Sequence, residues 1–156
     1  MIRTCVGYAG GATTSPTYER IGDHSESIEI DYDPAVLSYE DLLAEFFAGH
    51  DARAHSFSTQ YRSAIFYRTN AEWAAAERAL EKQESVRGRL HTSVEPLPRF
   101  WKAEDYHQKF YWKQFTQEWE RQASGKAPDQ RSAEFGEWLS ARGVSGCSIL
   151  RRTGTR

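Results

Sequence analysis

The sequence predicts an α+β domain, in which short strands alternate along the chain with longer helices. The length supports this, because 156 residues can bury a core in one domain without metals or disulfides. The composition supports it too, since 39% of the residues are hydrophobic and 13% aromatic, which favours a packed globule. The order of strand-like and helix-like segments then predicts two layers, with helices packed on a sheet.

Two strands are expected in the first third of the chain. Residues 2–8 alternate apolar and polar side chains, and a loop that opens with Gly10-Gly11 follows them. Residues 27–32 alternate in the same way, and an Asp-Pro pair follows. Each segment therefore has the period of a strand with one buried face.

Two helices are expected on either side of a third strand. Ser38 is expected to cap the first helix, with Asp41 at the capping-box position. The third strand is expected over residues 63–67. Asn70 is expected to cap the second helix, which Gly88 ends.

The last part of the chain is expected to hold one short strand and two helices. The strand is expected over residues 92–94, and two prolines just after it argue against a central position in a sheet. A helix is expected over residues 105–122, and Ser132 is expected to cap a last short helix. We therefore expect one domain over residues 1–122, followed over 123–156 by a connector, a short helix and a flexible tail.

Charge and hydropathy exclude several classes of function. The formal net charge of -2 gives no electrostatic reason to expect nucleic acid or an anionic membrane as a partner. No apolar run approaches the roughly 20 residues that span a bilayer, and the N-terminus does not resemble a signal peptide. The five histidines do not have metal-ligand spacing, so no metal site is expected. We expect a monomeric, cytoplasmic protein with no bound cofactor.

Three polar clusters lie where predicted loops meet strand ends. Tyr18 follows the first strand, Glu26 directly precedes the second, and Tyr61 lies just before the third. A carboxyl group beside an aromatic pocket is partly desolvated, which favours its protonated form and suits it to donate a proton. Tyrosine hydroxyls add donors for a polar oxygen. From the residues alone, other interpretations stay open. Glu26 is also consistent with a solvated loop residue, and Tyr18 and Tyr61 are also consistent with core aromatics. His24 is also consistent with a hydrogen bond within the loop.

Six strings in this chain resemble the successive signatures of class A peptide methionine sulfoxide reductases. In order they are Val-Gly-Tyr-Ala-Gly-Gly from residue 6, Ser-Pro-Thr-Tyr from 15, His-Ser-Glu from 24, Ile-Asp-Tyr-Asp-Pro from 30, Gln-Tyr-Arg-Ser-Ala-Ile-Phe-Tyr from 60 and Ala-Glu-Asp-Tyr-His-Gln from 103. The resemblance implies a ferredoxin-like mixed sheet with helices on one side and a C-terminal helical extension. It also implies thiol-dependent reduction of methionine S-sulfoxide in peptides or proteins.

The same resemblance implies roles for particular side chains. In the family, a cysteine thiolate attacks the sulfoxide sulfur, while one Glu and two Tyr hold and protonate the oxygen. Those oxygen-holding roles fall on Tyr18, Glu26 and Tyr61. The attacking cysteine becomes a sulfenic acid, which a second thiol reduces.

Other residues of these strings are candidates for substrate binding, namely His24, Gly10 and Gly11. The resemblance implies oxidised peptides or proteins as partners. It also implies an external thiol reductant, either thioredoxin or dithiothreitol.

The cysteines depart from the family pattern. The family nucleophile lies in a Gly-Cys-Phe-Trp motif on an earlier strand, and the printed sequence does not contain it. We therefore expect an incomplete copy in which the first strand is missing and turnover is low. Cys147 is a candidate resolving thiol. Cys5 is a candidate nucleophile, but it lies within a predicted strand, so its side chain should point to one face of the sheet rather than to the end of the strand. Two unrelated thiols are the alternative interpretation.

A second departure concerns Tyr61. The family commonly has an Asp five residues before this tyrosine, where this chain has Ser56, so we expect Tyr61 to be held less firmly. Two other functions stay open. One is a non-catalytic module that binds methionine sulfoxide, and the other is an interaction module whose partner surface consists of C-terminal aromatic residues, namely Trp112, Trp119, Phe135 and Trp138.

Overall fold

The computed structural model describes residues 3–125 and residue 134. The chain divides into two compact units, residues 1–108 and 109–156. The domain boundary expected after residue 122 stays a prediction. The predicted short helix after Ser132, the aromatic residues Phe135 and Trp138 and the thiol of Cys147 lie outside the described residues.

The described strands form two sheets. In the first sheet β1 (Arg3–Ala9) pairs antiparallel with both β2 (Ser25–Asp31) and β5 (Phe100–Lys102), so the order is β2-β1-β5. In the second, β3 (Ala64–Tyr67) pairs parallel with β4 (Ser93–Pro96). The α+β class is confirmed. The single mixed sheet is not, because the ladders described divide into an antiparallel and a parallel set.

Both long helices of the first unit begin at capping boxes. Ser38 caps α1 (Tyr39–Ala48) together with Asp41, as predicted. Thr69, and not Asn70, caps α2 (Asn70–Arg87). The sequence-based assignment was wrong by one residue because the Thr69 hydroxyl accepts from the backbone of Glu72, whose carboxylate returns to the Thr69 backbone.

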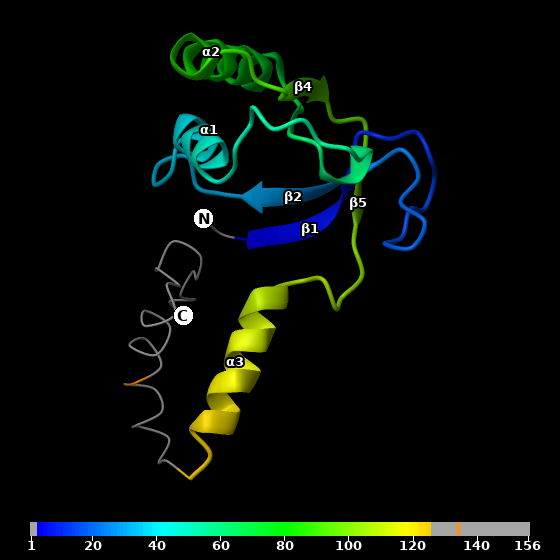
Figure 1. Cartoon of the computed structure of the whole chain (residues 1–156), viewed down its shortest axis with the longest axis vertical. Coiled ribbons are helices and arrows are strands. Elements are labelled where there is room, and N and C mark those ends of the chain that lie inside the picture. The colour runs from blue at the N-terminus through cyan, green and yellow to red at the C-terminus, as the bar shows by residue number, and fades with distance from the viewer. Residues whose placement is uncertain (1–2, 126–133, 135–156) are drawn as a thin grey trace. The chain divides into compact units, whose positions relative to one another are not determined.

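The core of the first unit lies where α1, α2 and β3 meet. Its buried members come from both helices, from β3 and from the segments next to them, namely Leu43, Phe47, Ala52, Ile65, Ala75, Ala76 and Leu90. Figure 1 shows α1 and α2 side by side. The loop before β3 is tied to the start of β2 by the Ser25 hydroxyl, which donates to the Thr59 oxygen, and the candidate site lies there.

The segment after β4 differs most from the prediction. β5 was not expected, and the predicted helix over 105–122 is shorter, because α3 spans Phe110–Gln122. The Gln108 side-chain amide explains the late start. It accepts from the Val6 nitrogen at 2.9 Å and donates to the Val6 oxygen at 2.8 Å, which continues the sheet edge where a strand residue would pair. Among the described helices, none has the length and apolarity of a membrane span.

Candidate active site

The side chains of Asp23 and His24 stabilise the loop between β1 and β2 through hydrogen bonds to its backbone. The Asp23 carboxylate accepts from the backbone of Ala12 at 2.7 Å and of Thr13 at 3.1 Å, and these bonds hold its pKa below the usual range. His24 is fully buried, and its Nδ1 accepts from the Gly11 nitrogen at 3.2 Å. Its Nε2 therefore carries the proton and donates to the Thr13 oxygen at 2.7 Å.

Both glycines predicted to bind substrate lie in this loop. Gly10 has φ +83°, a conformation that favours glycine, and a Cβ there would lie 2.7 Å from the Phe66 ring. A Cβ at Gly11 would lie 2.5 Å from an Asp23 oxygen. The geometry of these glycines and the ring bonds of His24 shape the loop, and their binding role stays a prediction.

The structure brings Glu26 and Tyr61 together through Gln60. Glu26 lies on β2, and Tyr61 ends the short 3-10 helix η1 (Thr59–Tyr61). The Gln60 Nε2 lies 2.6 Å from the Glu26 Oε1 and 3.0 Å from the Tyr61 hydroxyl oxygen. Ser25, the buried residue before Glu26, donates to the Thr59 oxygen at 2.8 Å and so ties β2 to η1.

Tyr18 lies in the loop between β1 and β2, and its side chain interacts with Tyr61. Backbone bonds between Thr17 and Arg20 form a tight turn that presents the Tyr18 side chain. A hydrogen-bonding interaction with the Tyr18 side chain is the first cause that raises the pKa of Tyr61 to about 12. The two phenol side chains are 42% and 60% exposed, so a ligand can reach them from solvent.

Glu104 holds the backbone of Tyr18 through a hydrogen bond. One carboxylate oxygen accepts from the Tyr18 nitrogen at 3.0 Å, and the other accepts from the Tyr8 hydroxyl at 2.7 Å. Tyr8 is buried in β1, and burial is the first cause that raises its pKa. The His107 ring lies 4.7 Å from the Tyr18 ring and adds a second support.

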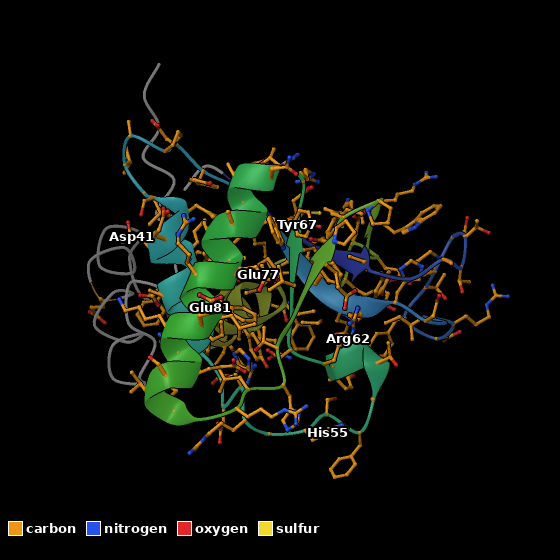
Figure 2. All side chains as sticks on the ribbon, turned by 90° about the horizontal axis from the view of Figure 1, so that it is seen from above. Asp41, His55, Arg62, Tyr67, Glu77 and Glu81 are labelled. Carbon is orange, nitrogen blue, oxygen red and sulfur yellow. The ribbon has the colours of Figure 1, made fainter. Side chains whose placement is uncertain are left out.

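Arg62 fastens the site to the second sheet. Its guanidinium forms two bonds with Glu95 on β4, and its Nε donates to the Ser25 oxygen at 2.7 Å. These bonds hold the pKa of Glu95 below its usual range. Arg62 is labelled in Figure 2, where it lies at the start of β3.

A cavity of about 480 Å³ opens beside Glu26 and Tyr61. Residues of β2 and β3 form its two sides, and α1 contributes aromatic and aliphatic side chains that include Tyr39, Leu42 and Phe46. A polar group that enters between Glu26 and Tyr61 therefore has an apolar wall next to it. This arrangement suits a small polarised oxide with an apolar substituent.

Of the two cysteines, Cys5 lies within the part of the chain that the structure describes. Cys5 lies in the middle of β1, partly buried, with its sulfur 3.7 Å from the Val6 oxygen. The Ser56 hydroxyl donates to the backbone oxygen of Ser58 at 2.7 Å. Within residues 3–125 and residue 134, no cluster of His, Cys, Asp or Glu side chains could hold a metal ion.

Sequence reasoning missed two residues that organise the site, Gln60 and Glu104. Both lie inside strings quoted above, directly before Tyr61 and two residues before Tyr106. Their position close to a tyrosine of a family string was the only sign in the sequence that they belong to the site. This signal gave no role, because the contacts that matter join segments far apart along the chain, Gln60 to Glu26 across 34 positions and Glu104 to Tyr18 across 86.

Comparison with known proteins gives the family. Residues 1–137 match the family model described as peptide methionine sulfoxide reductase. Peptide methionine sulfoxide reductase A5 of Arabidopsis thaliana is 38% identical over 121 residues, which cover 73% of this chain and 48% of that protein. Peptide methionine sulfoxide reductase MsrA of Chromobacterium violaceum is 43% identical over 121 residues, covering 70% of this chain and 69% of that protein.

Solved structures agree with this match. The crystal structure of Mxr1 from Saccharomyces cerevisiae in reduced form superposes with a TM-score of 0.64 at 28% identity, covering 70% of each chain. The chain belongs to the class A peptide methionine sulfoxide reductase family. It spans about half the length of the A5 relatives that it matches.

Proposed function

We propose that this chain acts in the thiol-dependent reduction of methionine S-sulfoxide in peptides or proteins to methionine. The supporting observation is the group formed by Glu26, Tyr61 and Tyr18, which Gln60 and Glu104 hold at the ends of different elements. Glu26 and Tyr61 line a cavity with apolar walls, Tyr18 hydrogen-bonds with Tyr61, and each of the three side chains can hydrogen-bond a substrate oxygen. The substrate fits there with its oxygen toward the phenols and its methyl group toward the cavity.

The proposed reaction balances with two thiols. A thiolate attacks the sulfoxide sulfur and forms an S–S bond, while the oxygen takes a proton from the carboxyl group of Glu26. The S–O bond and the new S–S bond then break as the hydroxyl group passes to the attacking sulfur, which releases methionine. The oxygen ends on the attacking sulfur as a sulfenic acid, which a second thiol converts to a disulfide and water. Tyr18 and Tyr61 donate to the oxygen as negative charge develops on it.

The finer assignments belong to the same proposal. The reductant is an external thiol, thioredoxin in the cell or dithiothreitol in an assay, and no cofactor stays bound. The protein is a cytoplasmic monomer, and its sheet has the ferredoxin-like arrangement. His24, Gly10 and Gly11 support the substrate through the shape of their loop.

Reduction of a peptide that contains methionine S-sulfoxide, with dithiothreitol as reductant, tests the proposal. We expect slow thiol-dependent formation of methionine, because this chain lacks the Gly-Cys-Phe-Trp motif of the family. Glu26→Gln should lower that rate by about 100-fold or more because the proton donor is lost. Glu45→Gln, an exposed carboxylate on α1, is the matched control. Cys5→Ser and Cys147→Ser identify the thiol that carries the reaction. Full activity in Glu26→Gln would contradict the assigned role.

A binding module is the second candidate, favoured by the exposure of the two phenols. It predicts saturable binding of the sulfoxide peptide, weakened in Glu26→Ala, without consumption of thiol. The unoxidised methionine peptide is the control ligand. A chain that neither binds nor reduces the sulfoxide would exclude both candidates.

A further inference from the structure

The strongest unexplained feature of the site is the side chain of Gln60. Its amide nitrogen has two hydrogens, and two acceptors lie at bonding distance, the Glu26 Oε1 at 2.6 Å and the Tyr61 oxygen at 3.0 Å. In this arrangement the amide nitrogen donates to both oxygens. One donor group therefore spans the carboxyl group and the phenol.

This bridge fixes the direction in which Tyr61 can bond. Since the amide nitrogen only donates, a lone pair of the Tyr61 oxygen accepts from Gln60. The Tyr61 proton is then left to point away from Gln60, toward Tyr18 and the open side of the site. The hydroxyl is thereby oriented as a donor before any ligand arrives.

The backbone around Gln60 holds the bridge in place. The Gln60 nitrogen donates to the Ser58 hydroxyl at 3.1 Å, and the Ser58 nitrogen donates to the Ser56 hydroxyl at 3.2 Å. Ser56 thus organises the turn through its two hydrogen bonds with Ser58. The phenol is instead held by Gln60, at a place where the sequence pattern predicted a weaker anchor.

We propose that Gln60 is a positioning residue, which orients the Tyr61 hydroxyl as a hydrogen-bond donor toward the sulfoxide oxygen and keeps the Glu26 carboxyl beside it. This inference rests on the proposed function for its purpose, but the orientation itself can be measured without turnover. Gln60 does not need to touch the substrate. Its effect passes through Tyr61 and Glu26.

Titration of a 3-fluorotyrosine placed at residue 61 tests the bridge directly, because fluorine lowers the pKa of the phenol into an accessible range. In Gln60→Met, which keeps the length but removes the amide, the pKa at residue 61 should be higher by about half a unit or more. The sign follows because a donor to the phenol oxygen stabilises the phenolate. Gln117→Met, an exposed glutamine of α3, should leave the value unchanged.

A second variant protects the test against misfolding. Gln60→Asn keeps an amide but is one methylene shorter, so it cannot reach both acceptors, and the same rise is expected. An unchanged pKa in both variants would overturn the proposal, whether or not the protein reduces sulfoxides.

Kinetics then separate this inference from the proposed function. In a protein that reduces methionine sulfoxide, Gln60→Met should lower kcat by about tenfold, and the loss should largely disappear in a Tyr61→Phe background. Equal losses in both backgrounds would contradict action through Tyr61. Absence of turnover in every variant would count against the proposed function and leave the titration result standing.

Discussion

Asp23 controls the loop that carries Tyr18. Its carboxylate accepts from two backbone nitrogens and from the Thr13 hydroxyl, the last at 2.7 Å. All of these are donors that favour the ionised form, which is why the pKa of this exposed carboxyl is lowered. The loop is therefore held by one charge with several neutral partners.

A pH dependence follows from Asp23. A lowered pKa in the folded state means that the carboxylate stabilises the loop above its unfolded pKa of about 3.9, and that this stabilisation is lost as the pH falls through the folded value. Amide hydrogen exchange at Ala12 and Thr13 should accelerate, relative to the rest of the sheet, on acidification through that window. In Asp23→Asn the two amides should exchange fast at all pH values. Protection that does not change between neutral pH and pH 2 would contradict this account.

Part of the site at this scale could be predicted from the sequence. Tyr18, Glu26 and Tyr61 were predicted because each belongs to a string with a recognisable pattern, although their role remains untested. Gln60 and Glu104 could not be predicted, because their importance comes from contacts across 34 and 86 positions of the chain. Periodicity and motif spacing contain no information about such pairs.

Among the elements, the start of α2 gives a direct comparison between two neighbouring residues. Thr69 accepts from the Glu72 nitrogen at 3.2 Å, whereas Asn70 is already the first residue of the helix. The hydroxyl therefore satisfies a nitrogen that has no partner within the helix.

Replacement of the cap should be costly and replacement of its neighbour should not. Thr69→Ala is expected to lower the free energy of unfolding by about 1 kcal/mol. Asn70→Ala, the matched control, should change it by less than about 0.5 kcal/mol, since Ala favours helix. Urea unfolding followed by circular dichroism measures both. The reverse order of effects would restore the cap assignment made from the sequence.

The elements differ in how well the sequence predicted them. The capped helices and the alternating strands β1 and β2 were found because local patterns define them. β5 was missed because it has three residues and pairs with β1, almost a hundred positions earlier. The close approach of this pair explains Gly7, where a Cβ would collide with the Trp101 oxygen and the Phe100 ring.

At the scale of the first unit, one edge of β2 and one edge of β3 carry no strand partner among the described residues. Ile28 lies on β2 with 58% of its surface exposed. Edges of this kind, with apolar side chains, favour pairing between molecules.

We therefore predict that the protein, proposed above to be a monomer, begins to aggregate as its concentration rises, and that Ile28→Lys reduces this aggregation because a charge on an edge strand opposes pairing. Light scattering over a concentration series measures the effect. Val86→Lys is the control, since Val86 is 80% exposed but lies on α2. Equal effects of both substitutions would point to net charge rather than to the strand edge.

The two sheets of the first unit meet through side chains. Arg62 bonds to Ser25, Gln60 to Glu26, and Arg68 to Glu29 at 2.5 Å, and the site lies along this seam. Side-chain contacts of this kind can break one by one, whereas the backbone hydrogen bonds of paired strands break together. Small relative displacements of the sheets would thus change the spacing between the Glu26 carboxyl group and the Tyr61 phenol before the helices unfold. The geometry of the candidate site should therefore respond to mild salt or acid stress earlier than global unfolding does.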